Sequence, residues 1–257
     1  MATKRDENQE LTLREHLEEL RVRLIWSVLA VAVTSVVSFA FLTKNAIEFL
    51  KAKAPEGTEF QFIEITEGWS VYLRVGLFCA VALALPFIVY QAMMFVRPAL
   101  TRRETIYVYL LLPGVAVLFI TGVLFAYYVF LGNALSFLVD SPFLEDLLGK
   151  PQLRIGEYIS QITKILFGMG LAFETPLIIF FLAKMGIVTT GQLLRKWRYA
   201  VVIAFVVAAI ITPTWDPINC SIVAGPLVAL YFLGIFLSWI AGGGKKKEEG
   251  SVVLEEG

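Results

Sequence analysis

Residues 158–185 read YISQITKILFGMGLAFETPLIIFFLAKM, a long apolar run with one acidic side chain, Glu174, near its middle. A bilayer core about 30 Å thick needs roughly 20 such residues in a helix, so the run is long enough to span it. An ionisable group at mid-depth costs on the order of 2.5–3.5 kcal/mol on insertion scales and usually marks a functional site. The run predicts a membrane-spanning helix that carries a functional carboxyl group.

Pro176 lies two residues after Glu174. Proline removes one backbone donor and frees the carbonyl of Ala172, so we expect the helix to bend beside the carboxyl group. Two interpretations of Glu174 stay open. It is either a neutral glutamic acid hydrogen-bonded to a neighbouring helix, or part of a polar cavity that thins the bilayer or admits water.

The composition indicates that lipid surrounds most of the chain. Of its 257 residues, 58% are hydrophobic and 17% are charged, and the mean hydropathy is +0.73, which is too apolar for a soluble domain. Five further apolar runs lie at residues 24–42, 71–96, 105–138, 197–212 and 218–240. We predict an all-α membrane protein of six transmembrane helices. Because the third run is long, and the fifth and sixth helices are expected to be short, we predict a concave, glove-like arrangement.

Positive charges between the runs predict the orientation. Lys and Arg number fifteen on the side of the two chain ends and five on the other side. The positive-inside rule therefore places both termini in the cytoplasm. The outer connections, 43–70 and 139–157, are expected to form a cap. The predicted domains are a cytoplasmic amphipathic helix at 1–23, the transmembrane domain at 24–240 and a disordered cytoplasmic tail at 241–257.

The N-terminal segment 12–23 contains acidic residues on an amphipathic helix. Its leucines recur at helical spacing, at Leu13, Leu17, Leu20 and, just beyond, Leu24. Glu19 stands four residues before Arg23, so the two side chains either pair with each other or leave the carboxylate for a ligand.

Two turns carry further acidic residues. In the turn at 95–104, Thr101 and Glu104 fit a capping box that starts the third helix, and a capping carboxylate keeps one oxygen for a ligand. In the Pro-rich turn at 212–217, Asp216 fits the N-cap of the sixth helix. Both carboxylates have a structural explanation as well as a functional one.

Several classes of protein are disfavoured. His16 is the only histidine, and Cys79 and Cys220 lack metal-ligand spacing, so no metal or cofactor is expected. The chain has no Gly-x-Ser-x-Gly motif and no paired intramembrane aspartates, which argues against a membrane enzyme. A net charge of +0 gives no indication of nucleic-acid binding. A proton-coupled transporter with Glu174 as its proton site is the alternative. It is disfavoured because the first, third and sixth spans have no interior charge.

Six stretches along the chain resemble the TatC family, the multi-spanning receptor subunit of the twin-arginine protein translocase. In family order they are HLEELR (16–21), PFIVYQ (86–91) with FVRPALTRRE (95–104), FAYY (125–128), FETP (173–176), KMGI (184–187) and TPTWD (212–216). The resemblance covers residues from about 12 to 240.

The resemblance implies a receptor, not an enzyme, in the bacterial cytoplasmic (inner) membrane. It would bind twin-arginine signal peptides of folded proteins, recruit single-span TatA- and TatB-type subunits for export driven by the proton-motive force, and self-associate in a receptor complex. Glu19 and Glu104 would contact the arginines, with the site shaped by Arg21, Gln91 and Phe95. The resemblance also implies an intramembrane polar face with Glu174, Tyr127 and Pro176. Partner docking and the outer turn would involve Thr212 and Asp216.

The chemistry of the ligand fits this expectation. Adjacent side chains of an extended peptide point to opposite sides, so one carboxylate binds two neighbouring arginines poorly. Carboxylates on two separate elements suit such a peptide. Arginine binds carboxylates with a planar fork that lysine lacks, which gives a reason for arginine specificity.

Overall fold

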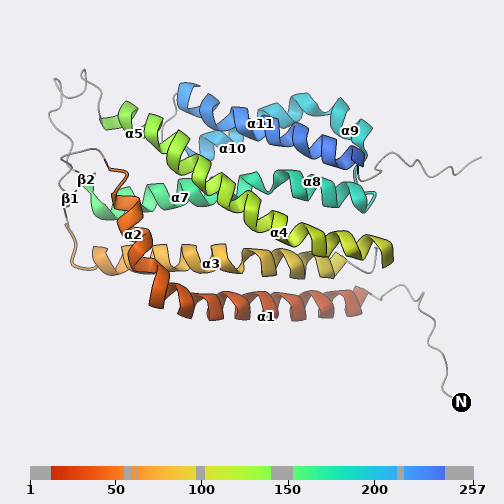
Figure 1. The fold of residues 1–257 in the computed structure, drawn as a ribbon, viewed down its shortest axis with the longest axis horizontal. Coiled ribbons are helices and arrows are strands. Elements are labelled where there is room, and N and C mark those ends of the chain that lie inside the picture. The colour runs from red at the N-terminus through yellow and green to blue at the C-terminus, as the bar shows by residue number, and fades with distance from the viewer. Residues whose placement is uncertain are drawn as a thin grey trace, which may run out of the picture. The chain divides into compact units, whose positions relative to one another are not determined.

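The computed structural model describes residues 13–54, 60–61, 63–96, 102–139, 153–212 and 217–240 (Figure 1). The chain forms two compact units, Met1–Val117 with Val139–Thr163, and Leu118–Leu138 with Lys164–Gly257. The first unit contains α1 (Leu13–Val37), the π-helical turn η1 (Ser38–Leu42), α2 (Thr43–Lys51), β1 (Phe60–Gln61), α3 (Glu67–Val96) and β2 (Leu153–Arg154). The second contains η3 (Ala126–Phe130), α5 (Leu131–Val139, except for its last residue), α8 (Thr175–Lys184), α9 (Thr190–Arg195), α10 (Trp197–Ile211) and α11 (Pro217–Ile240). Helices α4 (Arg102–Phe125) and α7 (Ile155–Phe173) contribute residues to both.

The membrane-spanning helices agree with most of the predicted runs. Among the described residues, five helical segments are long and apolar enough to cross a bilayer: Arg14–Lys51, Glu67–Phe95, Leu112–Leu135, Ile155–Lys184 and Pro217–Ile240. The fifth predicted span is α10, and its 15 residues confirm that it is short. The predicted all-α membrane class is confirmed, whereas the concave arrangement, the domain boundaries and the cytoplasmic position of both ends stay predictions.

The expectation of a short sixth helix is wrong. Helix α11 has 24 residues and continues through Pro226. In lipid, a backbone group outside a helix has no water to bond to, so continuing the helix past one proline costs less than ending it in the membrane. Within the described ranges, the fifth span alone is shorter than a bilayer normally requires.

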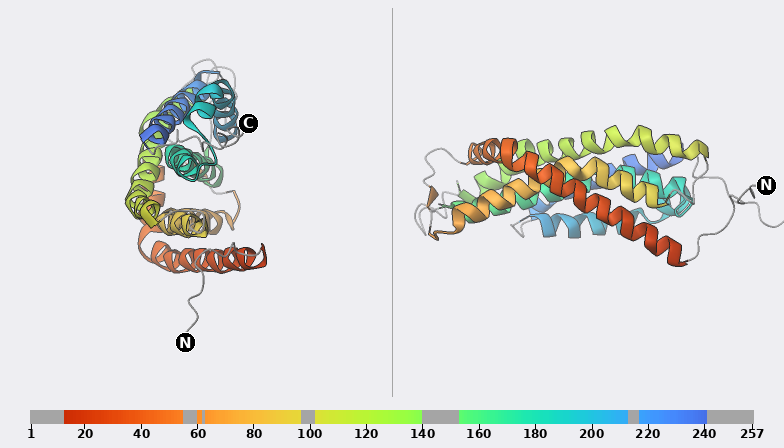
Figure 2. Two further views of the ribbon diagram at one scale, coloured as in Figure 1. Left: turned by 90° about the vertical axis from the view of Figure 1, so that its right-hand side faces the viewer. Right: turned by 90° about the horizontal axis from the view of Figure 1, so that it is seen from below.

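In the first unit, α1 packs along α3, and Figure 2 shows α1 crossing α3 diagonally. Hydroxyl groups on η1 and α1 bind carbonyls of α3: Ser38 of η1 donates to Gly76 over 2.7 Å, and Thr34 of α1 donates to Ala80 over 2.9 Å. A Cβ atom at Gly76 would lie 2.0 Å from the Phe39 ring, so only glycine permits this approach. Small residues and interhelical hydrogen bonds hold this pair together, as expected for helices in lipid.

The first span does not end in a loop but turns through η1 directly into α2. A π-turn leaves carbonyls without their usual helical donors. Here the carbonyl of Ser38 accepts the backbone N–H of Thr43 and, over 2.9 Å, its hydroxyl, and the carbonyl of Phe39 accepts the Tyr72 hydroxyl over 2.8 Å. These bonds satisfy the turn, and α2 departs in a new direction (Figure 1).

The first and third connections meet through a small parallel sheet that the sequence did not predict. Phe60 pairs with Leu153 and Gln61 with Arg154. Beside it, the buried carboxylate of Glu67 accepts hydrogen bonds from the backbone N–H of Gly156 at 2.7 Å and of Ile63 at 3.0 Å. A glutamate at the first residue of α3 also suits the positive end of the helix dipole.

We expect Glu67→Ala to loosen this junction. Without the carboxylate, the N–H groups of Ile63 and Gly156 lose their acceptor, so their hydrogen exchange should accelerate by about tenfold or more. Exchange measured by mass spectrometry on peptides covering these residues checks the effect. Glu64→Ala is the control, because Glu64 is exposed and its 3.4 Å pair with Arg154 is weak. Equal exchange in wild type and Glu67→Ala would contradict the role.

The second unit is held together by aromatic contacts and by α11. The rings of Phe125 and Phe173 lie 5.6 Å apart, and those of Phe119 and Phe167 lie 6.3 Å apart. Helix α11 packs on α8 and α10, and the hydroxyl of Tyr231 donates to the carbonyl of Leu193 over 2.8 Å. These contacts position the end of α7, where Glu174 lies.

Candidate functional site

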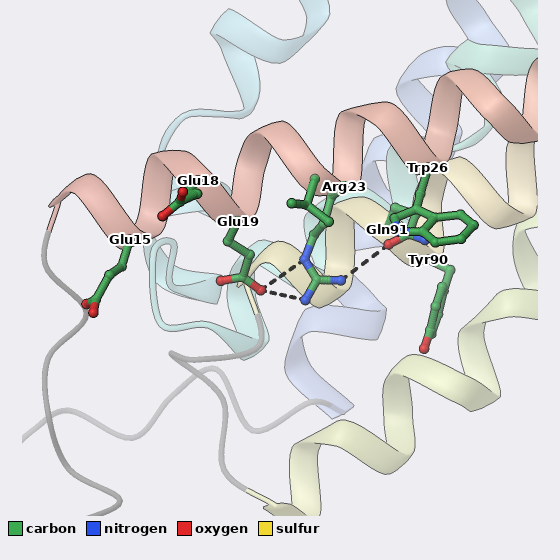
Figure 3. A pocket seen from close by; sticks show the side chains of 8 residues that line it. Glu15, Glu18, Glu19, Arg23, Trp26, Tyr90 and Gln91 are labelled. Carbon is green, nitrogen blue, oxygen red and sulfur yellow. Dashed lines mark hydrogen bonds and ion pairs between the residues drawn. The ribbon is translucent and has the colours of Figure 1, made fainter.

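An acidic cleft lies between α1 and α3 in the first unit (Figure 3). Its volume is about 570 Å³, and its lining residues are Glu15, Glu18, Glu19, Val22, Arg23, Trp26, Tyr90 and Gln91. The residues from α1 are spaced three or four apart, which places them on one side of that helix. Three carboxylates and one guanidinium line the cleft, so its lining carries a formal charge of −2. The cleft therefore favours a cationic ligand.

Arg23 binds Glu19 within the cleft. Its Nε atom donates to Glu19 Oε1 over 3.0 Å, and Nη2 donates to the same oxygen. Its Nη1 atom donates across to Gln91 Oε1 on α3 over 3.3 Å. This confirms the predicted pairing at i, i+4. Because both side chains are partly exposed, at 22% for Arg23 and 24% for Glu19, the pair contributes only about 0.2–1 kcal/mol.

A ring stack joins the same two helices near the cleft. His16 on α1 and Phe95 on α3 stack with centroids 4.3 Å apart and an interplanar angle of 21°. The stack holds the first turns of α1 against the end of α3. Phe95, taken from sequence as a site residue, thus lies where it supports the cleft.

Arg21 and Glu104, the other two residues predicted to bind the ligand, are not among the described residues that line the cleft. Arg21 is exposed and does not line the cleft. Glu104 is the third residue of α4, and its side chain lies outside the described part of the structure. The structure therefore brings Glu19 and Gln91 together through Arg23, and the roles of Arg21 and Glu104 stay predictions.

The acidic cleft continues into an apolar one. Trp26 lies at the end of the acidic cleft away from Glu15, and it also lines a second cleft of about 350 Å³ between the same helices (Figure 3). The other lining residues of the second cleft are Leu29, Ala30, Val33, Thr34, Leu83, Ala84 and Phe87. A polar surface thus passes directly into an apolar one along α1 and α3.

Glu174 interrupts the fourth span as the sequence predicted. It stands between α7 and α8 and is 5% exposed, and its Oε1 atom has no hydrogen-bond partner among the described residues. Pro176 is buried beside it. The carbonyl of Ala172, freed by Pro176, accepts a hydrogen bond from the Thr175 hydroxyl over 2.6 Å. The backbone carbonyl freed at the bend therefore has a local hydrogen-bond donor, whereas the described residues supply none for Oε1 of the carboxyl group.

Two further predicted residues are buried in the second unit. Tyr127 is 6% exposed and lies in η3, where the helix widens to π-helical pairing. The Thr212 hydroxyl donates to the carbonyl of Ala208 over 2.9 Å and contacts Cys220 Sγ at 3.5 Å, which joins the end of α10 to the start of α11. Asp216 falls in residues 213–216, outside the described chain. The functional roles of all three stay predictions.

Sequence reasoning missed five residues that line the cleft: Glu15, Glu18, Val22, Trp26 and Tyr90. A signal for the α1 residues was present, because positions 15, 18, 19, 22, 23 and 26 share one helix face. No comparable signal exists for Tyr90, since its position depends on how α3 packs against α1.

These features define a multi-pass helical membrane protein with an acidic cleft, followed by an apolar one, between its first two spans. The chain belongs to the Sec-independent protein translocase protein (TatC) family, whose sequence model matches residues 15–226. Members of this family are subunits of a protein translocase, so the chain is a transport component and not an enzyme.

Individual relatives cover nearly the whole chain. The TatC protein of Aquifex aeolicus is 38% identical over 93% of this chain and 98% of its own length, and that of Koribacter versatilis is 34% identical over 90% and 86%. The chloroplastic TATC protein of Arabidopsis thaliana is 35% identical over 92% of this chain and 68% of its own length. A crystal structure described as the twin arginine translocase receptor TatC is 38% identical, with a TM-score of 0.76, and covers 89% of this chain and all of that one.

Proposed function

We propose that the chain is the receptor that binds twin-arginine signal peptides of folded proteins at the cytoplasmic face of the membrane. The observation that carries the proposal is that Glu19 binds a guanidinium, that of Arg23, within a negatively charged cleft. A carboxylate that already accepts hydrogen bonds from one guanidinium offers the chemistry that a second guanidinium needs.

The two arginines require two acceptors. Because neighbouring side chains of an extended peptide point to opposite sides, one arginine reaches Glu19 while the other needs a carboxylate on a separate element. Glu104 on α4 is our candidate for the second. Gln91 and Phe95 shape the site through Arg23 and His16 respectively, and Arg21 acts on the exposed side of α1.

The apolar cleft beyond Trp26 supports the same ligand class. A peptide that enters with its cations at Glu19 and continues along α1 meets Leu29, Val33 and Phe87. Adjacent cations followed by an apolar stretch therefore match the order of surfaces in the protein. Burial of the apolar residues would add to affinity in proportion to the area removed from water.

The proposal includes a setting and partners. The chain would lie in a bacterial cytoplasmic membrane with both ends in the cytoplasm, in a concave arrangement, and would self-associate. It would recruit single-span TatA- and TatB-type subunits through a surface that includes Thr212 and Asp216. Glu174, with Tyr127 and Pro176, would supply the polar group at mid-depth during transport driven by the proton-motive force. The buried Oε1 of Glu174, for which the described residues supply no hydrogen bond, supports this last assignment.

Co-purification with cargo tests the proposal. A folded protein that carries an Arg-Arg signal peptide should co-purify with the chain in mild detergent, whereas its Lys-Lys variant should be recovered at least about tenfold less, because lysine lacks the planar fork. The two cargoes carry the same charge, so a difference in their recovery reports the planar arrangement of donors that arginine has and lysine lacks. Equal recovery of both cargoes would contradict the proposed function.

A further inference from the structure

We propose that Arg23 is an internal competitor for the signal peptide. Its guanidinium binds Glu19, and it must release Glu19 Oε1 before an arginine of the peptide can bind both oxygens of that carboxylate. The inference rests on the proposed function, because it concerns the same carboxylate and the same class of ligand.

The geometry of the Arg23–Glu19 pair carries the inference. Both Nε and Nη2 of Arg23 donate to Oε1, so one edge of the guanidinium is committed to a single oxygen. Among the described residues, no hydrogen bond reaches Glu19 Oε2. An incoming arginine can therefore approach Oε2, but a pair of parallel hydrogen bonds to the carboxylate needs Oε1 as well.

The surroundings of Arg23 allow it to leave. Its Nη1 atom is held by Gln91 Oε1 on α3, and this acceptor remains after Glu19 is released. The carboxylates of Glu15 and Glu18 line the same cleft and keep its potential negative (Figure 3). Partial exposure of the Arg23 side chain gives the freed guanidinium access to water. Release of Glu19 therefore leaves neither charged side chain buried without a partner.

The size of the effect follows from the exposure of the pair. Ion pairs with this degree of exposure typically shift an equilibrium by up to about fivefold. Removing the competitor should tighten binding of an arginine ligand by that factor, because the ligand no longer has to break the pair. Tighter binding distinguishes a competitor from a supporting residue, since deletion of a residue that contacts or supports the ligand would weaken binding.

The test uses the full chain in nanodiscs and a fluorescent twin-arginine signal peptide. Arg23→Gln should lower the dissociation constant of the peptide by about two- to fivefold. Arg14→Gln is the charge-matched control, since Arg14 is exposed on the same helix and does not line the cleft; it should change the constant by less than about twofold. Thermal unfolding of each variant checks that the fold is intact.

A double variant separates competition from a change in overall charge. With Glu19→Gln in place, adding Arg23→Gln should not tighten peptide binding further, because the carboxylate for which Arg23 and the peptide compete has been removed. Unchanged or weaker binding by Arg23→Gln would overturn the inference, as would an equal gain from Arg14→Gln or a gain that persists without Glu19. If the wild type binds Arg-Arg and Lys-Lys peptides equally, the proposed function fails; if it discriminates and Arg23→Gln shows no gain, only the competitor role fails.

Discussion

Glu19→Ala is expected to abolish crosslinking of the protein to a twin-arginine signal peptide while leaving it folded. A hydrogen-bonded ion pair to a guanidinium contributes about 1.5–3 kcal/mol, so loss of the carboxylate should weaken binding by roughly 10- to 150-fold. The fold should persist, because Glu19 is partly exposed and its pair with Arg23 contributes little stability. Photocrosslinking of a labelled peptide to detergent-purified protein measures the loss.

Glu104→Ala should have an effect of the same size if Glu104 binds the second arginine. Glu48→Ala, an exposed glutamate on α2 that lines no part of the acidic cleft, serves as the control and should crosslink like wild type. Unchanged crosslinking and export in both Glu19→Ala and Glu104→Ala would show that these carboxylates do not bind the arginines.

Substitutions at Glu174 are expected to change stability and transport in opposite directions. Burying a polar group without a hydrogen bond costs about 1–3 kcal/mol in protein mutational data, and Glu174 Oε1 is buried with no partner in the described part of the chain. Glu174→Leu should therefore stabilise the protein while reducing export by at least about tenfold, since stability gained at a functional polar group is commonly offset by lost activity. Glu174→Gln keeps size and polarity and should retain most export.

Export of a folded cargo into energised vesicles, measured beside thermal unfolding, tests this pair of effects. Leucine is the informative replacement because it fills a similar volume without a polar atom. Equal export by wild type, Glu174→Gln and Glu174→Leu would mean that the carboxyl group has no part in transport. Its place in the bend would then be structural only.

Local features of the fold followed well from local sequence. The bend at Glu174 was predictable, because Pro176 lacks the donor that Ala172 needs, and the structure shows the Thr175 hydroxyl in its place. The Glu19–Arg23 pair was predictable for the same reason, since a spacing of four residues places side chains together on any helix. The sixth helix was expected to be short, yet α11 has 24 residues, in keeping with the length of the apolar run 218–240 itself.

Contacts between distant segments were not predictable. Gln91 meets Arg23, and Phe95 meets His16, only because α1 packs along α3 in one register. Glu67 looked like an ordinary acidic residue of an outer connection, yet it accepts hydrogen bonds from Ile63 and from Gly156 far along the chain. Such pairings depend on helix packing and strand pairing, which leave no periodic pattern in a single sequence.

The sequence by itself determined that this protein spans a membrane with helices, which parts of the chain do so, and that a carboxyl group lies midway along the fourth span. It could do so because burial in lipid is decided by the length and polarity of each segment alone. Only the tertiary structure decided that the acidic face of α1 becomes a cleft, that Arg23 occupies Glu19 within it, and that an apolar surface follows. These depend on the close approach of two helices, which small residues such as Gly76 permit but do not specify.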